Sequence, residues 1–541
     1  MAYAAESGLV KGFPDGTFRP RQNLSRAEVA VIIEKYLSLQ GEKYSFYGNI
    51  TAINLPLRRA SIVIDGRSQE FELAANLAVY DEASRQPVTD LKLPAYAFFD
   101  LNTDGKLSFI MLASDYGSSP VKFEFEQLSA VSGAAVSPEQ AVSFAAEGIN
   151  LKTDYYDAAK AQASLEAAKD AMFADAFRSD SGASGRGQLV AVIDSGVDAG
   201  HPDLQKTDQD YAKIVDFIDL SAEGKLKLNL ASEENGRLQM GDRQADIPSG
   251  TAAGMRWKYA YLPLNFLPDE FGLKTSRLVV ARSSKAGGAL DTVYIDSDGD
   301  MEIKDETAVK VFSSGHQAVS VKGDGNRQFN VVVCSISDKD NYIILGYDAL
   351  GHGTEIAGIV AANGLVEGVA PDAQLLVIKV MNRLGVAPLK RLESAISLAA
   401  ERGAAAAVMS LGQYQMNEAE RQSLAQTAAA VMKTHGMIVC TAAGNNGPGL
   451  GTAADSAGIP GIISVGAYAT PRMWKTDYNY QVPDSTLWYF SSIGPSAGGA
   501  AAPMLLAPGH CVSTYPLWSG KQYNLDQGTS MAAPYLAGAW L

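Results

Sequence analysis

Three side chains that together could perform nucleophilic catalysis stand far apart in this sequence. Asp194 follows the apolar run LVAVI at 189–193, His352 stands between two glycines, and Ser530 opens a stretch of small apolar residues. A serine hydroxyl is a weak nucleophile until a base removes its proton. A histidine can take that proton while an aspartate orients the imidazole, and Asp, His, Ser is one of the known chain orders. Each residue alone has a structural explanation, but the combination predicts catalysis by a serine nucleophile.

Such chemistry also needs a donor for the negative oxygen of the tetrahedral intermediate. The apolar run at 437–443 leads to Gly444 and Asn445, and the Asn445 amide is a suitable donor. The string Asn-Asn-Gly also favours a simple turn. Because the other three groups are present, we expect Asn445 to be the oxyanion donor.

The segments around these residues predict the elements that position them. A continuous apolar run such as 189–193 is typical of a buried parallel strand, and open α/β sheets place their sites at the carboxyl ends of such strands. His352 precedes a helix rich in small residues. Ser530 begins a helix whose first turn tolerates Pro534 and whose dipole favours developing negative charge. Because apolar runs alternate with helical stretches from residue 188 onward, we expect an α/β domain with a parallel sheet.

These strings together resemble the subtilisin-like serine peptidases over 188–204 and 346–541. The three main blocks of the resemblance are AVIDSG at 191–196, GHGT at 351–354 and GTSMAAP at 528–534. The resemblance implies a subtilisin-like parallel sheet flanked by helices, protein or peptide substrates and no required cofactor. The implied catalytic residues are Asp194, His352 and Ser530, with Asn445 as the oxyanion residue.

The same resemblance implies how a substrate binds. The strand that pairs with the substrate backbone, a form of β-augmentation, would be Ser410, Leu411 and Gly412. The walls of the primary specificity pocket, with room for a fairly large side chain, would be Ala442, Ala443 and Gly444. One position departs from the family pattern, because Glu355 stands where the family has a second histidine.

The segment between Asp194 and His352 is far longer than a minimal member of this family needs. Its β-like runs are at 277–280, 292–295 and 329–333. They predict a β-rich insertion over 205–345 at the rim of the site. The string DSDGD at 296–300 resembles a calcium loop, but Thr307 occupies the twelfth position, where a carboxylate is needed. A hairpin is favoured there, and a structural calcium ion is the alternative.

Residues 1–40 carry a second resemblance. A Pro-Asp-Gly turn within GFPDGTF at 12–18 and a capping box, SRAE at 25–28, precede an amphipathic helical pattern. These strings resemble part of an S-layer homology module, which anchors exported bacterial proteins to cell-wall polysaccharide. The resemblance implies that Arg26 contributes to sugar binding. Such modules usually occur in threes, so a remnant of a longer anchor is the alternative.

Two further segments separate this module from the α/β domain. Residues 44–132 alternate apolar and polar side chains between turn signals, which predicts a small antiparallel β domain. Within it, DLNTDG at 100–105 resembles a calcium loop, but Met111 at the twelfth position favours a hairpin. Residues 137–187 are alanine-rich and then rich in glycine and serine, which predicts a helical connector. The peptidase domain is then expected over 188–541.

Composition limits the classes of partner. The 541 residues include 60 acidic and 45 basic side chains, and the net charge of −15 argues against nucleic-acid binding. No apolar run reaches the roughly 18 residues of a membrane span. Three cysteines cannot form a disulfide framework, and the absence of zinc-ligand spacing predicts no metal among the site residues.

The cellular location is predicted from the S-layer homology resemblance alone, because the N-terminus lacks the features of a signal peptide. We expect an extracellular or cell-wall-associated serine endopeptidase that acts through an acyl-enzyme. The sequence stops at Leu541, inside the helix expected to begin near Ser530, whereas members of the family continue for several more elements. We therefore expect the natural chain to extend beyond both ends of this sequence. One alternative is a cell-wall-binding protein whose truncated protease-like domain is inactive. Another is an exopeptidase restricted to oligopeptides, in which the insertion blocks one end of the cleft.

Overall fold

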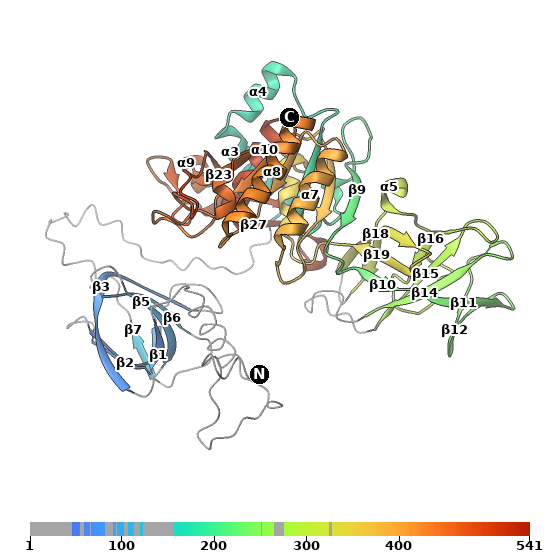
Figure 1. Ribbon diagram of the computed structural model, residues 1–541, viewed down its shortest axis with the longest axis horizontal. Helices are drawn as coiled ribbons and strands as arrows, with labels where there is room; N and C mark the ends of the chain where they lie inside the picture. Colours follow the sequence, from blue (N-terminus) through green and yellow to red (C-terminus); the bar gives the residue numbers. More distant parts are fainter. Residues whose placement is uncertain are drawn as a thin grey trace. The chain divides into compact units, whose positions relative to one another are not determined.

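The chain divides into two units, Met1–Asn150 and Leu151–Leu541 (Figure 1). Residues 1–45, with the expected S-layer module and Arg26, lie outside the described residues. The computed structural model describes residues 46–54, 59–64, 67–81, 90–93, 95–101, 106–112, 119–122, 156–249, 251–263, 275–323 and 327–541.

Five strands of the first unit close into a barrel in the order β1-β2-β3-β6-β5. Their bounds are β1 (Phe46–Asn54), β2 (Arg59–Ile64), β3 (Arg67–Asp81), β5 (Ala95–Leu101) and β6 (Leu107–Leu112). A separate antiparallel pair is formed by β4 (Asp90–Leu93) and β7 (Ser119–Lys122). Ile50, Ile62 and Phe99 are fully buried, so the barrel has an apolar interior.

The β domain expected in this region is confirmed. Neighbouring barrel strands are antiparallel except β3 and β6, which run parallel. Strands β5 and β6 pair antiparallel, with Asp100 opposite Phe109, as a hairpin requires. Residues 102–105 of the hairpin turn expected over 100–105 lie outside the described residues.

The second unit is built on a sheet in the order β24-β23-β22-β21-β8-β20-β9, with β25 beside β23. The bounds are β8 (Leu189–Asp194), β9 (Ile214–Asp219), β20 (Gln374–Lys379), β21 (Ala406–Met409), β22 (Ile438–Ala442), β23 (Ile462–Ala469), β24 (Thr486–Leu487) and β25 (Leu505–Pro508). Neighbouring strands from β23 to β9 are parallel. In β8, Val190 and Val192 pack into one core and Ala191 and Ile193 into another. A strand covered on both faces needs apolar residues throughout, which explains the run LVAVI and confirms the expected parallel sheet.

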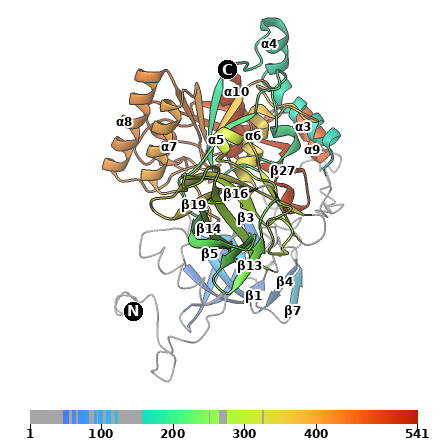
Figure 2. The ribbon, with the colours of Figure 1, turned by 90° about the vertical axis from the view of Figure 1, so that its right-hand side faces the viewer.

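Helices cover both faces of this sheet (Figure 2). One layer consists of α7 (Leu389–Glu401) and α8 (Glu418–His435). The other consists of α3 (Ala158–Asp170), α6 (His352–Ala361), α9 (Pro471–Tyr478) and α10 (Thr529–Ala539). A capping box of Asn417 and Glu420 begins α8, and Gly436 in the left-handed conformation ends it.

The segment predicted as a helical connector contains α3 and, after it, α4 (Ala174–Ser181). Ala161 and Leu165 of α3 are fully buried in the same core as α6 and α10. This helix is therefore an integral layer of the second unit.

The β-rich insertion consists of two sheets. The first contains β10 (Lys225–Lys227), β17 (Val319–Lys322), β18 (Gln328–Ser337) and β19 (Tyr342–Gly346). The second contains β11 (Asn229–Glu234), β12 (Arg237–Met240), β13 (Arg243–Asp246), β14 (Trp257–Leu262), β15 (Arg277–Ser283) and β16 (Leu290–Ile295). Val279, Val293 and Phe329 share one core that joins the two sheets, and the short helix α5 (Phe312–Gly315) precedes β17. Strand β9 falls inside the range predicted for the insertion but belongs to the parallel sheet, so the inserted strands run from β10 to β19.

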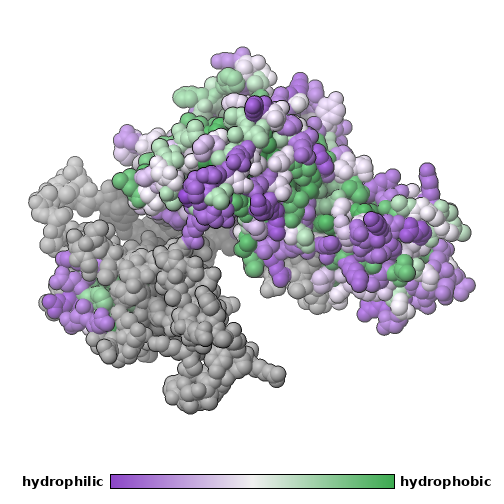
Figure 3. All heavy atoms as spheres, in the orientation of Figure 1, coloured by the Kyte–Doolittle hydropathy of each residue, from purple (hydrophilic) through white to green (hydrophobic). Residues whose placement is uncertain are grey.

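The surface of the second unit mixes hydrophilic and hydrophobic side chains over the face drawn in Figure 3. Among the helices of the described residues, none has both the length and the apolar character needed to cross a membrane.

Candidate active site

The carboxyl end of β8 and the beginning of α6 bring Asp194 and His352 together. Asp194 is 1% exposed, and its Oδ1 lies 2.8 Å from Nδ1 of His352. The turn before α6 passes through Gly351 at φ 88°, where a Cβ would lie 2.5 Å from the Tyr515 ring. Since Nδ1 faces the carboxylate, Nε2 is the nitrogen left to accept a proton from a substrate or nucleophile.

Asp348, which the sequence reasoning missed, ties the two segments to each other. Its Oδ1 accepts hydrogen bonds from the Ser195 hydroxyl at 2.8 Å and the Gly351 N–H at 2.9 Å. Its Oδ2 accepts from the N–H and the hydroxyl of Thr354, at 3.0 and 2.6 Å. The carboxylate therefore connects the residue after Asp194 to the turn that carries His352. An acid shortly before a glycine-containing turn is the only sequence signal for this role.

The environment of His352 acts on its pKa in two directions. Burial lowers the pKa, because it disfavours the imidazolium. The carboxylates of Asp194, Asp526 and Asp348 raise it, and the balance places the pKa at about 9. At neutral pH the imidazole is therefore largely protonated, and it becomes a base as the pH rises.

Ser530 is the second residue of α10 and shares a cleft of about 330 Å³ with His352. Its hydroxyl donates to the Ser410 carbonyl at 3.0 Å, and the Ser410 hydroxyl donates to the Ser530 carbonyl at 2.8 Å. A hydroxyl carries one proton, so in this arrangement the proton is directed at Ser410 rather than at His352. The predicted nucleophile and the predicted base thus line one cleft. Catalytic hydrogen bonds are often long in a free enzyme and tighten only when substrate binds.

Thr529 fixes the orientation of the Asn445 side chain. Asn445 Oδ1 accepts from the Thr529 N–H at 2.8 Å and from the Thr529 hydroxyl at 2.9 Å, while that hydroxyl accepts from the Gly444 N–H at 3.1 Å. Because the oxygen of the amide is held in this way, its NH₂ group is free to donate elsewhere. Asn445 is exposed beside the residue that precedes Ser530, so an amide donor stands next to the predicted nucleophile. Thr529 was also missed, although it adjoins Ser530.

The two segments predicted to bind substrate differ in accessibility. Ser410, Leu411 and Gly412 line the cleft together with His352 and Ser530. Ala442, Ala443 and Gly444 are buried, and within the described part of the chain they are not among the residues that line this cleft.

Glu355, the position that departs from the family pattern, is buried in α6 and is 1% exposed. Asn524 donates to its Oε1 at 3.1 Å. Burial, followed by the charge of Asp526, raises the pKa of Glu355 well above its usual range. Burial thus favours the neutral form of this carboxyl, and Glu355 is not among the described residues that line the cleft.

The acidic loop after β16 has the oxygen ligands that calcium prefers. Carboxylate oxygens of Asp296, Asp298 and Glu306 lie within 4.8 Å of one another. Backbone N–H groups already bind this set: that of Gly299 donates to Asp296 at 2.6 Å, and that of Ser297 to Glu306 at 2.6 Å. The chain reverses over the loop as expected of a hairpin, since residues 293 and 309 form an antiparallel bridge.

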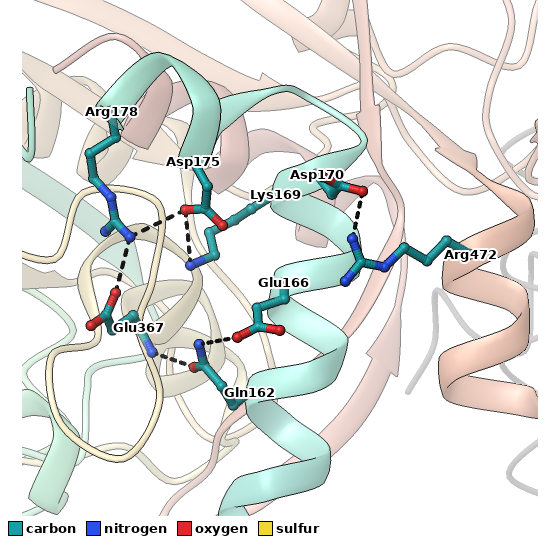
Figure 4. A pocket seen from close by; sticks show the side chains of 8 residues that line it. All are labelled: Gln162, Glu166, Lys169, Asp170, Asp175, Arg178, Glu367 and Arg472. Carbon is teal, nitrogen blue, oxygen red and sulfur yellow. Dashed lines mark hydrogen bonds and ion pairs between the residues drawn. The ribbon is translucent and has the colours of Figure 1, made fainter. Parts of the chain in front are cut away.

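A second pocket, between α3, α4 and α9, is an ion-pair network (Figure 4). The side chains are paired within the pocket: Lys169 with Asp175 at 3.3 Å, Arg178 with Glu367 at 3.1 Å, and Arg472 with Asp170 at 2.5 Å. These ion pairs attach α3 and α4 to the rest of the unit, while the Glu166 carboxylate accepts a hydrogen bond from the Gln162 amide at 3.0 Å.

Two family models match the sequence. The model described as the subtilase family matches residues 185–540, and the model described as the S-layer homology domain matches residues 1–30.

Curated relatives include both archaeal and eukaryotic proteins. Pyrolysin from Pyrococcus furiosus is 27% identical over 450 residues, which cover 67% of this chain and 31% of pyrolysin. Tripeptidyl-peptidase 2 from Oryza sativa subsp. japonica is 27% identical over 435 residues, 65% of this chain and 32% of the relative. Serine protease AprX from Bacillus subtilis is 31% identical over 233 residues, 38% of this chain and 51% of the relative. The matched part of the chain thus spans about a third of the length of the first two relatives.

Proposed function

The chain belongs to the subtilase family, and on this premise we propose that it is a serine endopeptidase acting through an acyl-enzyme on Ser530. The observation that carries the proposal is the 2.8 Å contact between His352 and Asp194 in a cleft that Ser530 also lines. This arrangement provides a nucleophile, a base and an orienting carboxylate for acyl transfer.

The proposed reaction begins with a peptide strand pairing with residues 410–412. Nε2 of His352 takes the proton of the Ser530 hydroxyl as Oγ attacks the substrate carbonyl carbon. The NH₂ group of Asn445 donates to the oxyanion that develops. His352 then protonates the leaving amine, and the C–N bond breaks. Water repeats the sequence on the ester, with His352 again as base, and releases the carboxylic acid.

Asp194 has the role of holding the imidazole in one tautomer and stabilising the imidazolium. The reaction needs no cofactor, and structural calcium at the acidic loop stays a prediction. The division into a module at 1–40, a β domain at 44–132 and a peptidase domain at 188–541 also stays a proposal, and of the expected connector at 137–187 we assign α3 to the peptidase domain, because it packs into the same core.

A cell-wall-associated location is part of the proposal and is supported by the S-layer homology match at residues 1–30. Cell-wall polysaccharide would bind through Arg26, and protein substrates would be cleaved outside the cell. Sedimentation of the protein with purified cell walls, compared between wild type and Arg26→Ala, tests this role, and equal sedimentation of the two would contradict it.

The catalytic role of Ser530 is tested by labelling with an organophosphate reagent. We expect stoichiometric labelling of the wild type and of Ser314→Ala, an exposed serine on the insertion, and no labelling of Ser530→Ala. Equal labelling of Ser530→Ala and wild type would refute the assignment.

An exopeptidase is the second candidate function. It is supported by relatives named tripeptidyl-peptidase 2. The insertion also packs on the segment that follows Asp194, because Asn330 of β18 donates to the buried Asp198 at 2.7 Å. Rates on a folded protein, a long peptide and a tripeptide amide separate the two functions. Cleavage within the folded protein supports the endopeptidase, and release of tripeptides alone supports the exopeptidase.

A further inference from the structure

Tyr414 lies between residues 410–412, which are expected to pair with the substrate backbone, and residues 442–444, which are expected to wall the primary specificity pocket. The side chain of the residue whose carbonyl is attacked is here termed the primary side chain, and the two segments are termed the first and the second wall. A Cβ added at Gly444 would lie 2.1 Å from the Tyr414 hydroxyl oxygen. A Cβ added at Gly412 would lie 3.2 Å from Cε2 of the same ring. The ring therefore spans from one wall to the other, in the space that the two glycines leave open.

The hydroxyl of Tyr414 is held by hydrogen bonds beside the second wall. It forms hydrogen bonds with the Ser492 side chain and the backbone N–H of Asn445, while burial raises the pKa of Tyr414. Ser492 is itself held, since its Oγ accepts from the Asn446 N–H and its own N–H donates to the Gly444 carbonyl, both at 3.0 Å. The ring is thus anchored next to the residue proposed as the oxyanion donor.

The burial of the second wall agrees with this position. Ala443 is fully buried and packs with Ala453 and Ala454, whereas Gly412 of the first wall lines the cleft. Tyr414 is 42% exposed, so part of its side chain is accessible from solvent. A primary side chain entering between the walls would meet this ring before it reached Ala443.

We propose that Tyr414 is a specificity-determining residue that confines the primary side chain to small ones, such as glycine, alanine and serine. The inference rests on the proposed peptidase function. A long or aromatic side chain would have to displace the ring and break the contacts of its hydroxyl. This differs from the room for a large side chain that the small residues at 442–444 alone suggest.

The first test compares kcat/KM for peptide p-nitroanilides that differ only in having alanine or phenylalanine as the primary residue. We expect the wild type to prefer alanine. Tyr414→Ala should raise the phenylalanine-to-alanine ratio by about ten- to a hundredfold, because it opens the volume of an aromatic ring. Tyr414→Phe, which keeps the ring, should leave the ratio within about threefold of wild type, as should Tyr211→Ala, an exposed tyrosine outside the cleft.

The second test uses binding and does not require turnover. In the Ser530→Ala background, dissociation constants are measured by calorimetry for two N-acetylated peptides that differ only in the same alanine or phenylalanine. Adding Tyr414→Ala should strengthen binding of the phenylalanine peptide by about tenfold relative to the alanine peptide.

The two tests separate the inference from the function on which it rests. A wild-type preference for phenylalanine, or ratios that Tyr414→Ala leaves unchanged in either assay, would overturn the role of Tyr414. Absence of both cleavage and organophosphate labelling in the wild type would instead overturn the proposed function, and the binding ratios would still decide whether Tyr414 controls the pocket.

Discussion

The pKa of His352 sets the pH range in which the imidazole can act as a base. Burial lowers this pKa, and three carboxylates raise it to about 9. The proposed mechanism needs the neutral imidazole, so kcat/KM should rise with pH and reach half its maximum near pH 9. Asp526 contributes to this shift without contacting the imidazole nitrogen that Asp194 binds.

Replacing Asp526 by asparagine removes one of the charges that stabilise the imidazolium. We expect Asp526→Asn to move the midpoint of the pH dependence of kcat/KM to lower pH by roughly half a unit. Asp484→Asn, an exposed aspartate, is the control and should leave the midpoint in place. A midpoint that stays near the wild-type value, or moves to higher pH, in Asp526→Asn would contradict the electrostatic account.

Thr529 acts through Asn445 and is a positioning residue. Thr529→Val keeps the shape of the side chain but removes the hydroxyl that donates to Asn445 and accepts from Gly444. We expect kcat to fall about tenfold with little change in KM, since one hydrogen bond that orients the oxyanion donor is lost. Thr529→Ser retains the hydroxyl and should stay within about threefold of wild type. Steady-state kinetics that show equal kcat for the valine and serine variants would refute this role.

The elements that local patterns specify could be predicted, and the contacts between distant segments could not. The run LVAVI gives β8, because a strand buried on both faces must be apolar at every position. Strand β9, IVDFID, contains two aspartates and, among the strands that the structure describes, pairs only with β20 at the end of the parallel sheet. Its sequence pattern therefore does not indicate a core strand. The range expected for the insertion therefore included it.

The same distinction applies to the site. Asp194, His352, Ser530 and Asn445 follow strand ends or begin helices, and their types are visible in the sequence. The roles of Asp348 and Thr529 depend on partners that are distant in the sequence. The partner of Asp348 is Ser195, and the partner of Thr529 is Asn445. Such contacts depend on how the elements pack, so no local pattern indicates them.

Helix α6 carries a buried acid whose ionisation opposes folding. The pKa of Glu355 is raised well above 4.5 by burial and by Asp526, whereas in the unfolded chain it titrates normally. Because the folded state binds this proton more tightly than the unfolded chain does, protonation of Glu355 stabilises the folded state. This contribution is complete below about pH 4.5 and is lost as the pH rises through the folded-state pKa.

Glu355→Gln should therefore flatten the pH dependence of stability. Between about pH 5 and pH 9 we expect the melting temperature of the wild type to fall more than that of the variant, because only the wild type loses this contribution. Melting followed by circular dichroism over this range is the measurement. Glu233→Gln, an exposed glutamate of β11, should follow the wild type. A Glu355→Gln curve parallel to that of the wild type would mean that the carboxyl ionises normally in the folded protein.

The second unit extends beyond the region that defines its family. The family match begins at residue 185, but α3 lies before it and packs into the core that holds α6 and α10. Ser164 of α3 accepts the Val512 N–H at 2.8 Å in β26 (His510–Thr514), which pairs with β27 (Tyr523–Gln527) just before Ser530. The helix thus supports the strand pair that leads to Ser530.

This packing predicts how much of the chain the peptidase needs. A chain that begins at residue 151 should fold and retain activity. One that begins at 185 should melt at a lower temperature and lose activity, since it exposes the core face covered by α3.

In the full chain, Leu165→Ala should lower the free energy of unfolding by about 2–5 kcal/mol, because it leaves a buried cavity. Arg472→Ala removes a largely exposed ion pair with Asp170 and should cost about 0–1 kcal/mol. Denaturant unfolding and peptide hydrolysis measure both effects. Equal stability of the two shortened chains, or a Leu165→Ala cost no larger than that of Arg472→Ala, would show that α3 is only a connector.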